Sequence, residues 1–212
     1  MDFCSIAFVT VQSVDGIAAM EAIEKDPRWI GTYREIFSGV QRGCTYGLVG
    51  PRGTGKTLMA CMLVADLATR KRANYTKLST IMRKIRSTWN SRRLTEEQVF
   101  DFLAGLPILI IDELHEMTGN EPARAFIADL VDRRYARMLG TILIANFTVD
   151  EFIAFCGPSA LRRINERGEV IETSWPSFCE DGVTPMVQAR IEMSLPDFMP
   201  SRLDQDDSED VG

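Results

Sequence analysis

Short apolar runs alternate with amphipathic stretches along most of the chain. The apolar runs that predict strands cover residues 45–49, 74–77, 108–111, 141–145 and 170–173. Between them, apolar residues recur every three or four positions, which predicts helices. In chain order, these cover residues 56–70, the segment from the strand 74–77 through residue 90, and residues 95–103, 121–138, 149–155 and 159–166. Strands that alternate with helices pair in parallel. The pattern therefore predicts an α/β fold, a doubly wound parallel sheet.

The chain before residue 45 carries an extended apolar run at 5–11 and a helical pattern over 17–37 that is interrupted near Pro27. Trp29, Tyr33 and Phe37 lie four residues apart, on one face of this helix. Such an aromatic stripe is typical of core packing, so we expect the helix to lie against the sheet.

The length and composition fit one domain with short extensions. The chain has 212 residues, of which 45% are hydrophobic, enough to bury a single core. Residues 197–212 hold six acids and one base, so this tail carries most of the net charge of −6. We expect a domain over residues 16–179, an N-terminal extension over 1–15, and a C-terminal extension over 180–212 with a disordered acidic tail.

The sequence also indicates a compartment. Its longest apolar runs, such as residues 106–111, are too short to cross a bilayer as a helix, and the acidic N-terminus lacks the basic region of a secretory signal. Five scattered cysteines without a CxxC pair argue against a disulfide framework or a zinc site. We therefore expect a cytoplasmic protein with no membrane partner.

The segment after the strand 45–49 carries the main chemical motif. Residues 50–57 read GPRGTGKT, which fits GxxxxGK[ST] between a strand and a helix. Glycines let the backbone curl so that its amides face phosphate groups, and the helix dipole adds positive potential there. Lys56 adds a point charge, and Thr57 adds a hydroxyl ligand for Mg²⁺. The residues expected to bind ATP are Gly50, Pro51, Arg52, Gly53, Thr54, Gly55, Lys56, Thr57 and Leu58.

Two acids end the apolar strand 108–111, and the first of them lies 55 residues after Thr57. A buried strand that ends in paired carboxylates is unfavourable without a cation. We expect Asp112 to hold Mg²⁺ through water and Glu113 to polarise the attacking water. The pair favours hydrolysis over phosphoryl transfer to a small molecule.

Asn146 follows the strand 141–145 and would arrive beside Asp112 if the two strands are neighbours. Its amide would there orient the water or sense the γ-phosphate, although an Asn at a strand end is also a common turn former. His115 is the only histidine, and a single histidine without Cys or His partners makes a poor metal site. We expect His115 at the surface or behind the site.

The order of these motifs resembles the AAA+ ATPases, and within them the DnaC/IstB-like group of helicase loaders and transposition helper ATPases. The resemblance covers about residues 16–179 and is carried by GPRGTGKT (50–57), NYTKLSTIMRKIR (74–86), LPILIIDELHE (106–116), TILIANFT (141–148) and GPSALRRINERGEVIETSW (157–175). It implies a P-loop NTPase fold of the ASCE type, a three-layer αβα arrangement around a parallel sheet, without a separate helical lid domain. It also implies an ATPase that is slow as a monomer and is stimulated by oligomerisation or DNA.

By position, Arg163 matches the family's arginine finger, which reaches the nucleotide of a neighbouring subunit. The resemblance thus implies a homo-oligomer when ATP is bound. Arg163 could instead be a surface arginine that pairs with Glu166 or Glu169. Arg133 and Arg134 are competing candidates for the intersubunit contact. The residues expected in catalysis are Lys56, Glu113, Asn146 and Arg163.

Residues 70–93 contain nine bases and no acid. A solvated helix face would show the same bias, so composition alone leaves its role open. In the DnaC/IstB-like group, the helical segment after the second strand lies along single-stranded DNA, and here it corresponds to residues 79–93. Basic side chains would hold phosphates there and a tryptophan would stack on a base. The residues implied in DNA binding are Arg83, Lys84, Arg86, Trp89, Arg92 and Arg93.

The resemblance implies an ATP-dependent DNA-replication accessory protein that acts on a replicative helicase of the DnaB type and on single-stranded DNA, with ATP and Mg²⁺ as cofactors. A transposition helper that binds duplex DNA and a transposase shares the same motifs. Two further alternatives are a small-molecule kinase, which the position of Glu113 disfavours, and an adaptor that binds ATP as a switch with little hydrolysis. A GTPase is disfavoured because no NKxD guanine signature follows the strand that leads to Asn146.

Overall fold

A computed structural model describes residues 26–67, 73–89 and 94–178. In chain order, these residues form α2 (Pro27–Gln41), β1 (Thr45–Val49), α3 (Lys56–Leu67), β2 (Ala73–Lys77), α4 (Leu78–Thr88), α5 (Glu96–Gly105), β3 (Ile108–Asp112), η1 (Leu114–Met117), α6 (Glu121–Ala136), β4 (Gly140–Ala145), α7 (Val149–Arg167) and β5 (Glu169–Glu172). The extended run predicted at 5–11 and the tail over 180–212 lie outside the described residues.

The five strands form one parallel sheet in the order β2-β3-β4-β1-β5. This confirms the predicted doubly wound sheet. β4 lies between β1, which leads into the GPRGTGKT segment, and β3, which ends at Asp112. Because the strands are parallel, the segments that follow β1, β3 and β4 meet at one edge of the sheet.

Alternate residues of each strand face opposite layers of helices. In β3, Ile108 and Ile110 belong to one buried cluster, whereas Leu109 and Ile111 belong to the other. Asp112 has the parity of Ile108 and Ile110, so its side chain points to the face that α3 covers. This alternation decides which helix the acid meets.

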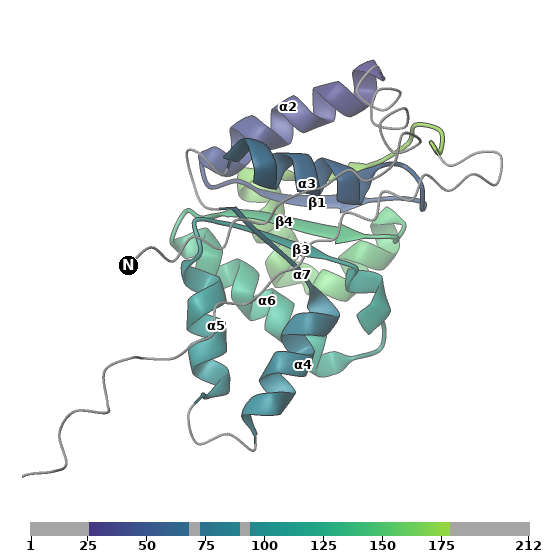
Figure 1. Cartoon of the computed structure of the whole chain (residues 1–212). Helices are drawn as coiled ribbons and strands as arrows, with labels where there is room; N and C mark the ends of the chain where they lie inside the picture. Colours follow the sequence, from purple (N-terminus) through teal and green to yellow (C-terminus); the bar gives the residue numbers. More distant parts are fainter. Residues whose placement is uncertain (1–25, 68–72, 90–93, 179–212) are drawn as a thin grey trace, which may run out of the picture.

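α2 and α3 cover one face of the sheet (Figure 1). Trp29 of α2 is only 1% exposed, and Tyr33 and Phe37 pack partly buried against the same apolar cluster. The predicted contact of this aromatic stripe with the core is therefore confirmed. α3 is mostly apolar because it packs against both the sheet and its neighbour α2 in the same layer.

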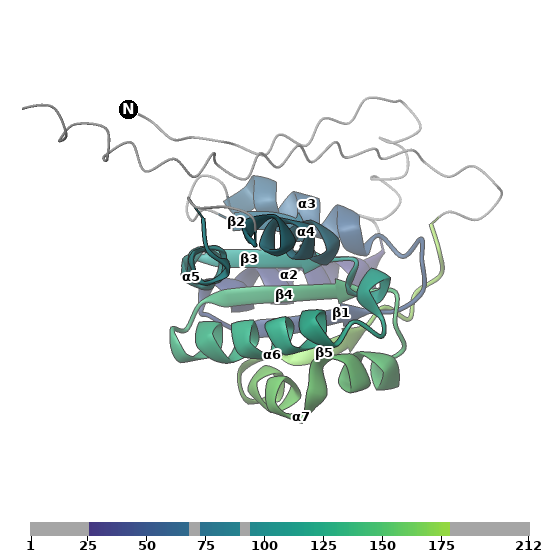
Figure 2. The ribbon, with the colours of Figure 1, turned by 90° about the horizontal axis from the view of Figure 1, so that it is seen from below.

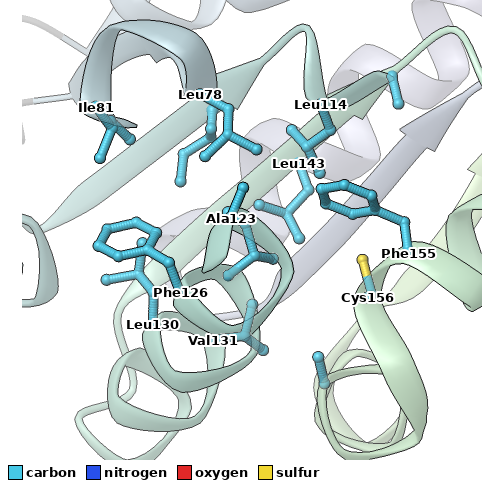
Figure 3. Close-up of a cluster of buried hydrophobic side chains, with 14 of the residues drawn as sticks. Leu78, Ile81, Leu114, Ala123, Phe126, Leu130, Val131, Leu143, Phe155 and Cys156 are labelled. Atoms are coloured by element: carbon cyan, nitrogen blue, oxygen red, sulfur yellow. The ribbon is translucent and has the colours of Figure 1, made fainter. Parts of the chain in front are cut away.

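α4, α5, α6 and α7 cover the opposite face of the sheet (Figure 2). Their apolar side chains form a second buried cluster with the other face of the strands. Figure 3 shows Leu143 of β4 in this cluster among Leu114, Ala123 and Phe155. The two clusters make the three-layer arrangement that the resemblance implied.

Local signals fix most helix boundaries. Pro27 is the first residue of α2, and Asp26 accepts hydrogen bonds from the backbone of the first turn, so the interruption near Pro27 is a helix start. Thr95 and Thr148 form capping boxes at α5 and α7. α7 consists of two helical segments on either side of a break at Gly157 (φ 76°, ψ 168°), which agrees with the two short helices predicted over 149–155 and 159–166.

Arg134 is a structural residue of the core. Its guanidinium is fully buried and donates hydrogen bonds to Thr141 Oγ1 (2.9 Å) and to the carbonyl oxygens of Leu103 (2.8 Å), Leu106 (2.8 Å) and Gly140 (2.6 Å). These bonds tie the end of α5 to the start of β4. The expectation that Arg134 contacts a neighbouring subunit is therefore wrong, because its side chain is fully buried and four of its five N–H groups donate inside the chain.

Arg133, the other candidate for an intersubunit contact, points outward from α6. It pairs with Asp101 at 2.5 Å and lies 4.5 Å over the Phe100 ring, with its side chain 45% exposed. Arg133 therefore stays available at the surface, in contrast to Arg134.

The described residues after β5, 173–178, contain no helix, so no separate helical lid domain follows the sheet there. None of the described helices is long and apolar enough to cross a membrane.

Candidate nucleotide site

The GPRGTGKT segment forms a tight loop between the end of β1 at Val49 and the start of α3 at Lys56. We call this segment, residues 50–57, the phosphate loop. Gly53 (φ 83°) and Gly55 (φ 74°) have left-handed backbone that other residues rarely adopt. The loop therefore needs glycine at these two positions to pass from strand to helix. It lies at a helix N-terminus, where backbone amides and the helix dipole favour an anion.

The Lys56 side chain folds back over the phosphate loop. Its Nζ donates to the carbonyl oxygens of Gly50 (2.9 Å) and Pro51 (2.6 Å) and lies 3.3 Å from Thr54 Oγ1. Burial lowers the pKa of the Lys56 ammonium to about 8. A polyphosphate would offer charged acceptors in place of these carbonyls, so Lys56 is well placed to bind one.

Thr57 and Asp112 meet where α3 begins and β3 ends. The Thr57 hydroxyl donates to Asp112 Oδ2 at 2.8 Å, and the backbone N–H of Glu113 donates to Asp112 Oδ1 at 2.6 Å. Asp112 is 2% exposed, so both oxygens of this buried carboxylate have partners. A hydroxyl and a carboxylate are the hard oxygen ligands that Mg²⁺ prefers, so this donor pair fits the ion.

Tyr75 of β2 is a further partner of Asp112 that the sequence did not reveal. Its hydroxyl donates to Asp112 Oδ2 at 2.8 Å. Burial and the neighbouring carboxylate raise the pKa of Tyr75, so the hydroxyl keeps its proton and remains a donor. Tyr75 pairs with Ile110 in the register of β2 and β3, which places it on the same face as Asp112.

Glu113 turns away from Asp112 because its backbone is left-handed (φ 60°, ψ 38°). Its carboxylate lies 3.8 Å from Lys77 Nζ and 3.3 Å from His115 Nε2, and its side chain is 25% exposed. A left-handed backbone is uncommon for a residue other than glycine, and such strain is typical of functional positions. The exposed fraction leaves the carboxylate accessible to water.

His115 connects Glu113 to Asn146. The backbone N–H of Asn146 donates to His115 Nδ1 at 3.2 Å, and the Asn146 side-chain amide lies 3.2 Å from Nε2. Because Nδ1 accepts, a neutral ring carries its proton on Nε2, which faces the Glu113 carboxylate. β3 and β4 are neighbours, as the placement of Asn146 required. In the described contacts, however, the partner of Asn146 is His115 and not Asp112.

The remaining residues expected to bind the nucleotide differ in exposure. Pro51 and Arg52 are exposed at the tip of the phosphate loop, whereas Thr54 and Leu58 are buried. The Leu58 side chain packs in the apolar cluster between α3 and the sheet, so only its backbone is available to a nucleotide.

The sequence also did not place Thr173 or Trp175 at the site. Thr173 Oγ1 lies 2.9 Å from Thr54 Oγ1, and the Trp175 indole N–H donates to the Thr54 carbonyl oxygen at 2.8 Å. These partners are 119 and 121 positions apart, so no local pattern could indicate the contact.

Arg163 lies on the second half of α7, which returns the chain from β4 to the start of β5. It is therefore displaced toward the edge of the sheet opposite its own phosphate loop. Its guanidinium pairs with Asp132 (2.9 Å) and Glu166 (3.5 Å), and it lies 4.8 Å from the centre of the Tyr135 ring. The pairing with Glu166 is the one that the surface alternative predicts.

The basic residues expected to bind DNA lie on α4, directly after β2. Arg83 and Arg86 are exposed, and Lys84 is partly exposed. The other face of α4 is buried, including Ile81 and Ile85, so the basic side chains project outward. Among the described residues, no ion pair involves these three bases. Their charges are therefore available to an anion.

Trp89 follows α4 and is 73% exposed, which is unusual for so large an apolar side chain. Arg92 and Arg93, also expected to bind DNA, lie outside the described residues.

The parallel sheet, together with the phosphate loop and Asp112 at the carboxyl ends of its strands, defines the class of protein, a P-loop ATPase. Residues 46–154 match the model of the ATPase family associated with various cellular activities (AAA), and the chain belongs to this family. The predicted resemblance to the AAA+ ATPases is thus confirmed.

Within this family, the chain is similar to proteins of DNA replication. The chain is 25% identical to the replicative helicase loader DnaC of Escherichia coli strain K12 over 142 residues, which are 66% of this chain and 56% of DnaC. It thus spans little more than half the length of that relative. A crystal structure of the DnaC helicase loader is similar with a TM-score of 0.58 and 17% identity, covering 77% of this chain and 92% of that one.

A structure of the replication initiator DnaA bound to AMPPCP and single-stranded DNA is similar with a TM-score of 0.56 and 15% identity. The likeness covers 81% of this chain and 51% of the initiator. At such identities, the two solved structures establish a shared fold.

Proposed function

We propose that the protein is an ATP-hydrolysing DNA-replication accessory protein, a DnaC-like loader that acts on a replicative helicase and single-stranded DNA. The observation that carries the proposal is the contact of Thr57 with Asp112 beside a complete phosphate loop. This arrangement suits a magnesium nucleotide. The similarity to DnaC directs it toward DNA replication.

The residues at the carboxyl ends of the strands have separate roles in ATP hydrolysis. The loop amides and Lys56 bind the phosphates, and Thr57 and Asp112 hold Mg²⁺, which neutralises phosphate charge when it is bound. Glu113 accepts a proton from the attacking water, since its carboxylate is partly exposed at the same edge. Asn146 supports this arrangement through His115.

Arg163 completes the site in a homo-oligomer. It is displaced from its own loop, and its contacts with Asp132 and Glu166 are partly exposed ion pairs, which could exchange for a phosphate of a neighbouring subunit's nucleotide. A guanidinium supplied by a neighbouring subunit stabilises the charge of the transition state and raises turnover by roughly 10³ to 10⁵. A monomer would therefore be a slow ATPase.

α4 supplies the DNA-binding face. Arg83, Lys84 and Arg86 project from it without acidic partners among the described residues, and exposed Trp89 follows it. Basic side chains beside an aromatic ring bind single strands with strong salt dependence and little sequence preference. The DnaA structure with a similar fold is itself bound to single-stranded DNA, which supports this assignment.

The test is ATP turnover per subunit over a range of protein concentrations, with single-stranded DNA, with duplex DNA, and without DNA. We expect the rate to rise with concentration and to change with single-stranded DNA. Lys56→Ala, which removes the phosphate contact, provides the control and should abolish ATP binding.

Two outcomes would contradict the proposal. A flat rate that ignores DNA would indicate a self-contained kinase or an adaptor that barely hydrolyses ATP. A response to duplex DNA alone would favour a transposition helper over a helicase loader.

A further inference from the structure

We propose that residues 173–178 form a strap that holds the phosphate loop in its binding conformation, so that nucleotide affinity depends on Thr173 and Trp175. We use strap for these six residues throughout. The inference rests on the proposed function, since it concerns ATP binding at the same loop.

Thr173 joins the strap to the residue before the loop and to the middle of the loop. Its backbone N–H donates to the Val49 carbonyl oxygen at 2.7 Å, where β1 ends. Its hydroxyl lies 2.9 Å from Thr54 Oγ1, and Thr54 and Thr173 are both fully buried. A Cβ atom at Gly50 would collide with the Thr173 side chain, so the two segments are in the closest packing that glycine permits.

Trp175 and Phe178 bind two successive carbonyl groups of the loop. The Trp175 indole N–H donates to the Thr54 carbonyl oxygen at 2.8 Å, and the Phe178 backbone N–H donates to the Gly53 carbonyl oxygen at 2.9 Å. Trp175 is only 4% exposed, so water does not compete well for its hydrogen bond.

These two bonds orient the amides that a phosphate would need. A trans peptide unit is planar, so its C=O and its N–H point in opposite directions. A Gly53 carbonyl held by the strap turns the Thr54 N–H away from the strap, and a Thr54 carbonyl held there does the same for the Gly55 N–H. The strap thus directs two loop amides to the opposite side, where the loop faces its ligand. Fixing them before binding lowers the ordering cost of binding ATP.

Burial alone does not give a tryptophan of this chain a hydrogen bond. Trp29 belongs to the same apolar cluster and is 1% exposed, yet its indole nitrogen has no hydrogen-bond partner within the described residues. The buried hydroxyl of Thr45 on β1 likewise has none among them. The chain therefore offers a matched control for each strap residue, one buried Trp and one buried Thr whose side chains form no hydrogen bond to the loop among the described residues.

The experiment measures the Kd of a fluorescent ATP analogue with Mg²⁺ for the full chain, and the melting temperature of each variant. Trp175→Phe and Thr173→Val should each weaken binding about five- to tenfold, the effect of one buried hydrogen bond. Trp29→Phe and Thr45→Val should bind within about twofold of the wild type, even where they lower the melting temperature. Thr173→Ser, which keeps the hydroxyl, should restore affinity.

If the strap variants bind the ATP analogue with the same Kd as the wild type, the proposed role of the strap is wrong. Equal losses of affinity in Trp175→Phe and Trp29→Phe would also contradict the proposal, because the weaker binding would then result from disturbed packing of the apolar cluster. If Trp175→Phe does not fold, Thr173→Val and its Ser counterpart carry the test. A wild-type protein that binds no ATP would instead contradict the proposed function, and with it the role of the strap.

Discussion

The Thr57 hydroxyl donates a hydrogen bond of 2.8 Å to the carboxylate of Asp112, a residue 55 positions further along the chain. The contact exists because α3 starts directly after the phosphate loop and because the alternation of β3 turns Asp112 toward the same face. Two oxygen ligands suited to Mg²⁺ therefore meet although separate elements carry them.

This contact predicts that Asp112→Asn removes the magnesium dependence of ATP binding. A neutral amide binds Mg²⁺ more weakly than a carboxylate, so we expect the affinity measured with Mg²⁺ to fall on the order of tenfold. The affinity in EDTA should change little. Titration calorimetry in both buffers checks the prediction, with Asp129→Asn, an exposed acid of α6, as the control. A magnesium effect that survives in Asp112→Asn would contradict the assignment.

The contacts of His115 predict that it positions Glu113 for hydrolysis without binding ATP. His115→Leu should lower kcat about tenfold with little change in KM, because Glu113 loses a partner at 3.3 Å while the phosphate loop is untouched. His115→Gln keeps a donor near the Nε2 position and should retain most of the activity. Glu113→Gln should trap bound ATP, with a loss on the order of 10² to 10⁴ in kcat. A change in KM alone would show that His115 acts on binding.

The location of Arg163 predicts a loss of stimulated turnover. Arg163→Ala should bind ATP as the wild type does and keep its slow basal rate, but lose most of the increase with protein concentration, up to about 10³-fold. Arg167→Ala is the matched control, because Arg167 lies on the same helix over the same Tyr135 ring, at 5.1 Å. Normal turnover of Arg163→Ala at high concentration would leave the surface alternative as the explanation.

The outward bases of α4 predict salt-dependent binding of single strands. Replacing Arg83, Lys84 and Arg86 together by Ala should weaken binding at low salt and reduce the slope of log Kd against log salt by about 2, since each phosphate contact contributes about 0.7. Fluorescence anisotropy of a labelled oligonucleotide measures both quantities. The control replaces three other exposed bases, Arg34, Arg42 and Arg137, which lie on or beside α2 and α6. Equal effects of the two triple variants would place the DNA elsewhere.

A carboxyl pair away from the site predicts a dependence of stability on pH. The hydrogen bond with Glu169, together with burial and the Glu169 charge, raises the pKa of Glu35 from 4.5 to about 7. The folded state therefore holds this proton more tightly, and the resulting stabilisation is fully present below about pH 4.5 and is lost as the pH rises through about 7.

Glu35→Gln carries no charge at any pH, so we expect it to melt about 1 °C above the wild type at pH 8 and at nearly the same temperature at pH 4.5, a small effect because Glu35 is exposed. Differential scanning calorimetry at both values measures it. Glu172→Gln, an exposed acid at the other end of β5, should show no such difference.

Features built from contiguous residues could be predicted from the sequence. The phosphate loop, the five strands and the fold class follow from short stretches in which strand, glycine turn and helix are adjacent in the chain. Some helix boundaries differ from the predicted ones because a cap such as Asp26 fixes the first residue of a helix more firmly than periodicity does. The 3₁₀ helix η1 was not predicted, because four residues are too few to show a period.

The amino-acid sequence alone was enough to define the class of site, because a phosphate loop is built from neighbouring residues whose conformations depend mainly on themselves. Which distant side chains meet there was set by tertiary packing. The buried position of Arg134, the link from His115 to Asn146, and the hold of Trp175 on Thr54 all depend on strand order and on the face that each residue occupies. Periodicity indicates that a residue is buried, but its partner is chosen by the packing of segments that lie far apart in the chain.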